Sequence, residues 1–327
     1  MNSPLLRLCI LALLGSVATA ARAQDISLRW LDETPPARNT GASFGVPWPQ
    51  GAVARDAAFT LSADGRALPV QTWPLAYWPD GSLKWSGVAT VVPAGFAGTA
   101  KLSVARPSAA SAPASGALRV TRDGRAIVID TGALVCAIPG AGGENLIDSL
   151  RIGEREAARA GRLVCILQNG PAPEPDESAA PGREAFSSIV KSATVEQSGP
   201  VRAVVRLEGF HRGARSGREW LPFTVRLYFH SGQTAVRMVH TIVFDGDQEK
   251  DFVRGLGVRF DVPMREQARN RTVRFAGENG GVWSEPLQPG GGNVAQETGE
   301  PFAATGNFFE NAIWDDFKLV QPNPRGF

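Results

Sequence analysis

Alternating apolar and polar side chains over residues 221–230 give the strongest structural signal in the sequence. The apolar side chains of one parity are Leu221, Phe223, Val225, Leu227 and Phe229. The side chains of the other parity are Pro222, Thr224, Arg226, Tyr228 and His230. Because successive side chains of a β-strand point to opposite faces, this stretch is expected to be a strand with one buried and one solvated face.

The same alternation recurs elsewhere and predicts an all-β protein. In residues 201–208, Val201, Ala203, Val205 and Leu207 share a face opposite Arg202 and Arg206. Short apolar segments separated by turn residues, with 36 Gly and 24 Pro in the 327 residues, fit many strands and hairpins. Half-buried strands of this kind favour a β-sandwich. Only residues 146–160 have a helix-like pattern, which Gly153 weakens.

Four Asp-Gly pairs lie between expected strands, and this dipeptide tolerates the positive φ angles of tight hairpins. The pairs are Asp64-Gly65, Asp80-Gly81, Asp123-Gly124 and Asp245-Gly246.

The N-terminal residues predict export. Arg7 precedes a short apolar run, and Ala21-Arg22-Ala23 has the small-x-small pattern of a cleavage site. Residues 1–23 are therefore expected to be a signal peptide, and the mature chain to be secreted or periplasmic. The apolar run is shorter than the roughly 20 residues that span a bilayer, so no membrane insertion is expected after cleavage.

Composition changes divide the remaining chain into two modules. Residues 106–117 are small, polar and Pro-containing, as in a linker. They separate a first domain, residues 24–105, from a second, residues 118–327. Residues 170–182 are expected to form a long loop inside the second domain.

Charge and cysteine content narrow the function classes. Removing Arg7 and Arg22 with the signal leaves equal numbers of acidic and basic residues, which argues against nucleic-acid binding. The excess of Arg over Lys suits carboxylate recognition, but a GC-rich genome produces the same bias. Export would permit a disulfide between Cys136 and Cys165, whereas strand cysteines that face apart cannot form one.

The polar strand face suggests a site for an acidic sugar. By parity it presents Arg206, Arg226, Tyr228 and His230, and the next strand adds Arg237. Arginines can pair with a uronate carboxylate, while Tyr and His can transfer protons. The alternative is a solvated outer face with cross-strand polar pairs.

Other polar residues have structural explanations beside functional ones. His240 has the opposite parity and is expected in the core, although it remains a catalytic candidate. His211 is expected at a strand end. The carboxylates of Asp245, Asp247, Glu249 and Asp251 could hold calcium, but their spacing departs from the EF-hand and fits a charged turn; no other cofactor is expected.

Tryptophans of the first domain could stack on sugars. Trp78, beside the turn at residues 79–81, is expected to be exposed and to contact substrate. Trp85 is expected to share an inward face with Leu83 and Ala89 and to pack in the core.

Several stretches resemble the exo-rhamnogalacturonan lyase/YetA-like family. The lyases of this family are similar to polysaccharide lyase family 26. Residues 44–51 and 73–85, with the motif Trp-Pro-Asp-Gly, resemble its N-terminal RIFT barrel. Residues 221–229, 240–247 and 251–257 resemble its central β-sandwich.

The resemblance implies a small RIFT-type barrel followed by a larger antiparallel sandwich, and β-elimination on rhamnogalacturonan. The family's third part, a helical toroid, is absent, so the chain is expected to be a fragment or to work without it. Within the matching motifs, Arg254 and His240 are candidates for catalysis.

Three functions stay open: a polysaccharide lyase or its front portion, a non-catalytic glycan-binding module, and a structural exported protein. In the first, Arg206, Arg226, Arg237 and Trp78 would bind substrate, and Tyr228, His230, His240 or Arg254 would take part in catalysis.

Overall fold

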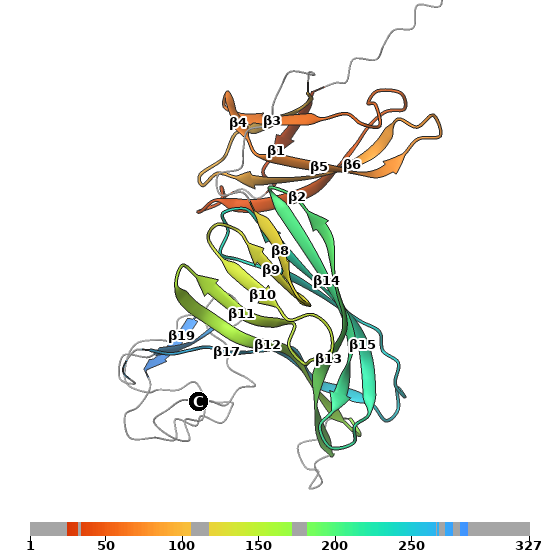
Figure 1. Cartoon of the computed structure of the whole chain (residues 1–327), viewed down its shortest axis with the longest axis vertical. Helices are drawn as coiled ribbons and strands as arrows, with labels where there is room; N and C mark the ends of the chain where they lie inside the picture. The colour runs from red at the N-terminus through yellow and green to blue at the C-terminus, as the bar shows by residue number, and fades with distance from the viewer. Residues whose placement is uncertain are drawn as a thin grey trace, which may run out of the picture. The chain divides into compact units, whose positions relative to one another are not determined.

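The computed structural model describes residues 25–31, 34–105, 118–171, 182–265, 267, 272–276 and 282–286. Within these ranges every regular element is a β-strand, which confirms the all-β expectation (Figure 1). The described residues up to Asp261 belong to one compact unit, and those from Val262 onward belong to another. The expected signal peptide, the expected linker and residues 172–181 of the expected loop lie outside the described residues.

The N-terminal domain, residues 25–105, consists of two small antiparallel sheets. The first contains, in spatial order, β1 (Ile26–Arg29), β7 (Thr99–Val104), β3 (Phe59–Ala63) and β4 (Arg66–Leu68). The second contains β2 (Thr40–Pro47), β6 (Leu83–Val92) and β5 (Val70–Tyr77). Their shared core includes Leu61, Val88 and Leu102, and Trp48 stacks on Phe59 with a ring-centroid distance of 5.3 Å.

The sandwich domain begins at Leu118 and is one continuous antiparallel sheet. Its strands in chain order are β8 (Arg119–Asp123), β9 (Ala126–Asp130), β10 (Val135–Ile138), β11 (Ile147–Ile152), β12 (Arg155–Gln168), β13 (Arg183–Ser198), β14 (Arg202–Gly213), β15 (Glu219–His230), β16 (Arg237–Ile242) and β17 (Phe252–Asp261). Each strand from β8 to β16 pairs with the next, and β17 pairs with β12.

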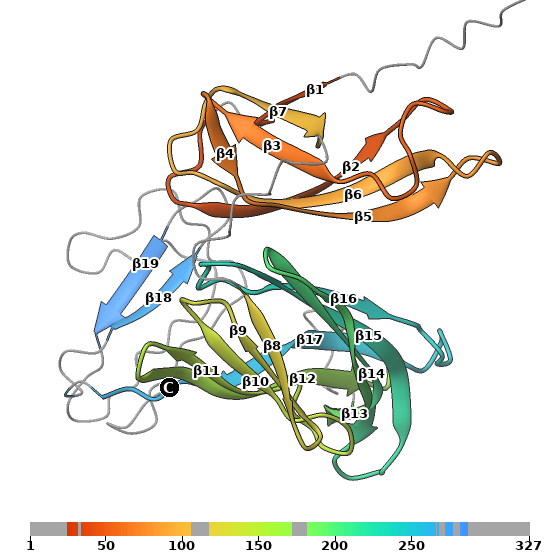
Figure 2. The same cartoon turned by 45° about the horizontal axis from the view of Figure 1, so that its top comes forward.

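The long strand β12 turns this sheet into two layers. Its first half pairs with β11 and its second half with β13, while β17 runs along its other edge. Strands β8–β10 therefore lie opposite β14 and β15 (Figure 2). Ile127 and Ile138 from one layer share a core with Val205 and Leu227 from the other, so burial of both inner faces stabilises the fold.

The predicted alternation of the two central strands is confirmed. From Leu221 to Phe229 each apolar residue of the inner parity is buried, and the polar residues between them are half-buried. Arg202 and Arg206 on β14 likewise alternate with buried Ala203 and Val205. One face of β14 and β15 is thus the core, and the other carries the polar side chains.

The helix-like reading of residues 146–160 is wrong. This stretch forms the β11–β12 hairpin, in which Ile152 pairs with Arg155 and Gly153 turns with a φ of 58°. Burial of Leu146 and Ile147 between neighbouring strands outweighs a helical preference that one interior glycine already reduces by about 1 kcal/mol.

Three of the four Asp-Gly pairs lie in hairpins, which join β3 to β4, β5 to β6 and β8 to β9. At the first of these, Asp64 and Gly65 both have positive φ, 49° and 75°. Asp245-Gly246 differs, because β16 and β17 do not pair with each other. Instead the carboxylate of Asp245 accepts a hydrogen bond of 2.9 Å from the Leu221 N–H.

Trp85 does not pack in the core as expected, since 40% of the residue is exposed. β5 shifts its register against β6 on both sides of Ala76. As a result Leu83, which is buried, and Trp85 do not share the same environment despite their equal parity.

Cys136 on β10 and Cys165 on β12 are both buried and not bridged. Burial raises the pKa of the Cys136 thiol to about 12 and that of Cys165 to about 11. Both therefore act as small apolar core residues.

The second unit contains a two-stranded hairpin of β18 (Thr272–Ala276) and β19 (Val282–Pro286). A search of the described residues finds no helix with the length and hydropathy needed to cross a bilayer.

Candidate functional site

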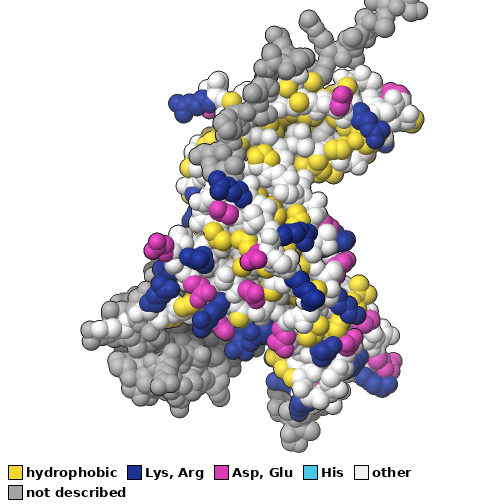
Figure 3. All heavy atoms as spheres, in the orientation of Figure 1, with side chains coloured by type: hydrophobic (Ala, Val, Ile, Leu, Met, Phe, Trp, Pro, Cys, Tyr) yellow, Lys and Arg dark blue, Asp and Glu magenta, His cyan; other side chains and the backbone are white. Residues whose placement is uncertain are grey.

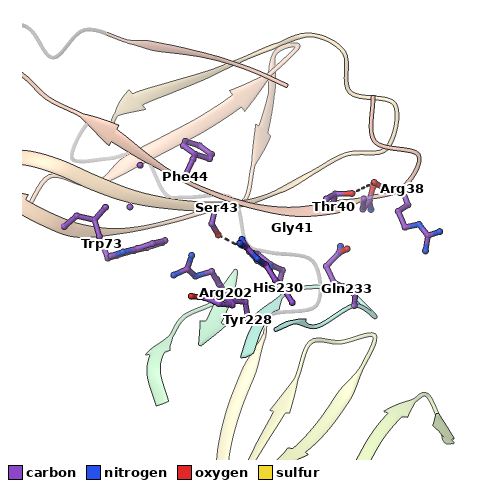
Figure 4. Close-up of a pocket in the computed structure, with 16 residues that line it drawn as sticks. Arg38, Thr40, Gly41, Ser43, Phe44, Trp73, Arg202, Tyr228, His230 and Gln233 are labelled. Carbon is purple, nitrogen blue, oxygen red and sulfur yellow. Dashed lines mark hydrogen bonds between the residues drawn. The ribbon is translucent and has the colours of Figure 1, made fainter. Parts of the chain in front are cut away.

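A cavity of about 490 Å³ lies where the N-terminal domain meets the sandwich domain, within the unit that ends at Asp261 (Figure 4). β2, β5 and β6 contribute one wall, and β14, β15 and β16 contribute the other. Its described lining consists of Arg38, Asn39, Thr40, Gly41, Ser43, Phe44, Gly45, Trp73, Leu75, Gly87, Arg202, Tyr228, His230, Gln233, Ala235 and Arg237.

Gln71 on β5 holds the two walls together through its side-chain amide. Its Nε2 donates to the carbonyl of Arg202 at 3.1 Å, and its Oε1 accepts from the N–H groups of Arg202 and Val201 at 2.8 and 3.1 Å. The first residue of β14 is thereby bonded to the N-terminal domain, which positions one wall of the cavity against the other.

A second contact joins β2 to β15. The Nε2 of His230 lies 3.2 Å from the hydroxyl of Ser43 (Figure 4). The imidazole also lies directly against Gly41, where an added Cβ would be only 2.3 Å from the Cγ of His230. This close approach requires glycine at position 41.

Four side chains form a ladder of alternating aromatic rings and guanidinium groups along the cavity. The Cζ of Arg202 lies 4.3 Å from the ring centroid of Trp73 and 5.4 Å from that of Tyr228. The Cζ of Arg237 lies 5.6 Å from the Tyr228 centroid. Such cation–π contacts hold the guanidinium groups in place without neutralising their charge.

The ladder also explains the glycine opposite Trp73. An added Cβ at Gly87 would lie 2.1 Å from the indole, so Trp73 is enclosed between Gly87 and Arg202. Trp73 therefore supports the Arg202 guanidinium, and the Nε of Arg202 is further held by a 2.7 Å hydrogen bond to Gln197 Oε1.

The electrostatic environment of the cavity is cationic. None of its described lining residues is Asp or Glu, whereas Arg38, Arg202 and Arg237 are all present. Burial lowers the pKa of Arg202; the Tyr228 phenol opposes this shift and the charge of Arg237 adds to it. Burial, together with the charges of Arg202 and Arg237, lowers the pKa of His230 to about 4, so His230 is neutral near pH 7.

Three of the residues that the sequence singles out meet in this cavity: Tyr228, His230 and Arg237. Arg206 and Arg226 do not line it. Both pair with Glu196, to which Arg226 donates two hydrogen bonds of 2.8 and 3.1 Å. Their charges are thus balanced within the sheet, as in the solvated-face alternative.

The remaining candidates also lie away from the lining. His240 is half-buried beside Phe223 and His211, and burial together with His211 lowers its pKa. His211 lies two residues before the end of β14, as expected, where it is fully buried, and its Nδ1 is 2.8 Å from the Leu221 carbonyl. Arg254 is exposed on β17.

Trp78 is half-buried rather than exposed. Its indole N–H donates to the carbonyl of Trp48 at 2.9 Å, and the Nζ of Lys84 lies 4.5 Å from its ring centroid. The indole thereby stabilises the turn between β5 and β6.

The carboxylates considered for calcium have protein partners. Asp251 accepts two hydrogen bonds of 2.7 Å from Arg218, and Asp247 accepts one of 2.8 Å from Lys250. Among the residues that the structure describes, no group of three or more His, Cys, Asp or Glu is arranged to hold a metal ion.

Sequence reasoning missed the N-terminal half of the cavity. Ser43, Trp73 and Gln71 belong to a domain whose docking onto β14 and β15 has no signal in local periodicity. Arg202 could have been found, since it shares the parity of Arg206 on the same strand.

Comparisons with known proteins match both domains. Residues 24–105 match the PcRGLX-like N-terminal RIFT barrel domain, and residues 118–327 match the PcRGLX-like protein central beta sandwich domain. The chain is 35% identical over 314 residues to a Bacillus subtilis (strain 168) protein named "Uncharacterized protein YetA". That alignment covers 90% of this chain and 35% of YetA, so the chain spans about a third of its relative.

These matches confirm the predicted resemblance and the predicted architecture of a RIFT barrel followed by a β-sandwich. The cavity lies between the two domains that the matches name. The chain belongs to the YetA/PcRGLX-like family.

Proposed function

We propose that the cavity between the barrel and the sandwich binds a carboxylate-bearing sugar of an acidic polysaccharide. The observation that supports this proposal is the pair of guanidinium groups on either side of Tyr228, in a cavity whose described lining has no acidic residue. Guanidinium groups recognise carboxylates through paired, charge-assisted hydrogen bonds.

A bound carboxylate would reduce the repulsion between the positive charges of the cavity. Arg202 is partly desolvated and lies near the charge of Arg237, and both effects lower its pKa. An anion close to both guanidinium groups would offset this repulsion and replace part of the lost hydration. The sugar hydroxyls would find polar partners in Ser43, Asn39 and Gln233, which also line the cavity.

Rhamnogalacturonan is the polysaccharide that the family resemblance favours, because its backbone contains galacturonate. Residues 1–23, which the sequence predicts to be an export signal, would bring the domains to a compartment where such polymers occur. No nucleic-acid ligand and no inserted membrane segment belong to this proposal.

Elimination is a second candidate, favoured by the position of Tyr228 between two guanidinium groups. There Tyr228 would exchange a proton with the uronate, while Arg202 or Arg237 neutralised the carboxylate. His230 is a weak base, since a pKa of about 4 leaves it little affinity for a proton. His240 and Arg254 have no role in this proposal, because neither lines the cavity.

Calorimetric titration with short rhamnogalacturonan oligosaccharides tests the binding proposal. Arg237→Ala should weaken binding about tenfold or more, since it removes one charge-assisted contact. Arg226→Ala is the matched control, because that arginine is paired with Glu196 outside the cavity, and it should leave the affinity unchanged. Oligosaccharides whose uronates have been reduced to neutral sugars should bind poorly.

The absence of any binding, or equal losses in the two arginine variants, would refute the proposal. Ultraviolet absorbance of an unsaturated uronate product reports elimination in the same samples. Product that disappears in Tyr228→Phe would support the second candidate, and binding without product would exclude it for this chain.

A further inference from the structure

Beside the cavity, the outer face of the β2–β6–β5 sheet exposes a row of large apolar side chains. Leu75 is 57% exposed, Trp85 40% and Tyr77 36%. Figure 3 shows hydrophobic side chains on this side of the N-terminal domain, over β5 and β6. Exposed aromatic side chains that are grouped in this way commonly mark a binding surface.

The row is continuous with the cavity. Leu75 and Gly45 both line the cavity, and the Trp85 ring lies over Gly45, where an added Cβ would be 3.5 Å from its Cε3. The same added Cβ would be 3.9 Å from Leu75. Because position 45 has no side chain, the Trp85 ring lies over the backbone there. Gly45, Leu75 and Trp85 thus form an apolar floor that leads out of the cavity.

The far end of the row is cationic. The Cζ of Arg55 lies 4.1 Å from the ring centroid of Tyr77, and Arg55 is itself exposed. Leu75 and Tyr77 are two residues apart on β5, so the row extends about 7 Å along the strand. Its order is therefore the arginines of the cavity, then an apolar floor, then a further guanidinium group.

We infer that this row is a second subsite for the same acidic polysaccharide, an inference that rests on the proposed function of the cavity. A neutral sugar packs its C–H face on Trp85 and Leu75, because a flat indole ring offers an apolar surface to a sugar ring. Arg55 then pairs with the carboxylate of the next acidic sugar along the polymer.

The charge pattern favours a glycan over a protein partner. Cationic groups stand at both ends of the floor, an order that suits a polymer in which acidic and neutral residues alternate. Because the floor shares Leu75 and Gly45 with the cavity, a single chain can occupy both places.

The inference is tested by the length dependence of binding, measured by calorimetry with a rhamnogalacturonan disaccharide and hexasaccharide. The hexasaccharide should bind about tenfold more tightly or better, from added stacking and ion pairing. Trp85→Ala should abolish most of this gain and leave disaccharide affinity unchanged, while Trp85→Phe should retain part of it. Arg55→Ala should reduce the gain and its dependence on salt.

Ile152→Ala is the control, since Ile152 is similarly exposed, 43%, on the β11–β12 hairpin and should have no effect. Thermal melting verifies that Trp85→Ala folds. The second subsite would be overturned if the hexasaccharide bound no more tightly than the disaccharide, or if its gain in affinity were insensitive to Trp85→Ala. The proposed function would remain intact in that case, provided that disaccharide binding still required Arg237. Failure of both ligands to bind would overturn both.

Discussion

The side-chain amide of Gln71 pairs with both backbone groups of Arg202, donating to the carbonyl and accepting from the N–H. This exchange imitates the pairing between two β-strands and joins the barrel to the first residue of β14. The guanidinium of the same Arg202 lines the cavity. The position of a proposed ligand-binding group thus depends on a contact between domains.

Replacing Gln71 should therefore affect stability and binding together. Gln71→Leu leaves the N–H groups of Val201 and Arg202 without their acceptor, at an expected cost of about 2–3 kcal/mol. Urea denaturation measures the loss, and the affinity for acidic oligosaccharide should fall in parallel. Gln71→Glu keeps the acceptor and should lose less; equal stability of wild type and Gln71→Leu would contradict the role of this contact.

Stability should decrease as the pH falls from 6.5 toward about 4, because burial lowers the pKa of His230 into that range. Between pH 6.5 and about 4, His230 is protonated in the unfolded chain but stays neutral in the folded protein. Its contribution to the free energy of unfolding is therefore complete above pH 6.5 and is lost as the pH falls toward 4. A pKa shift of this size corresponds to a change of about 3 kcal/mol in the free energy of unfolding. The pKa values of His211 and His240 are lowered as well and add to the slope.

Thermal melting of wild type and His230→Gln over this pH range isolates the contribution of His230. The variant should show a smaller difference between neutral and acidic pH. If the melting temperatures of the two proteins changed equally with pH, His230 would not contribute to the pH dependence of stability.

Gly41→Ala should destabilise the contact between the domains, because the new Cβ would overlap the His230 ring. Avoiding the overlap displaces either β2 or the imidazole and breaks its hydrogen bond to Ser43, so we expect a loss of about 1–3 kcal/mol and weaker ligand binding. Gly257→Ala on β17 is the matched control, since no atom lies within 4 Å of its added Cβ. Similar stability of the two variants would be incompatible with the packing at Gly41.

Cys136 and Cys165 should not react with thiol reagents in the folded protein. Reaction requires the thiolate, and burial raises their pKa values to about 12 and about 11. Mass spectrometry after alkylation should find both residues unmodified in native buffer and modified in denaturant. Rapid native labelling of either residue would show that the core opens easily around it.

Local alternation predicted the strands that carry the core, because a period of two reports which face is buried. It placed the apolar side chains of alternate residues in Leu221–Phe229, together with Ala203 and Val205, inward, and it put Tyr228, His230 and Arg237 on the opposite side. The same rule failed at Trp85, where register shifts at Ala76 interrupt the pairing of β5 and β6. It also failed over residues 146–160, where apolar spacing alone does not separate a helix from two strands joined by a turn.

Tertiary structure alone decided which arginines face the cavity. Arg206, Arg226 and Arg237 are equivalent by parity, yet Glu196 pairs with the first two, and only the third joins Arg202 at the junction with the barrel. Ion pairing and domain docking bring together residues that are far apart in sequence, such as Gln71 with Arg202 and Ser43 with His230. A periodic pattern reports only the direction of a side chain from its own strand, so it contains no information about such partners.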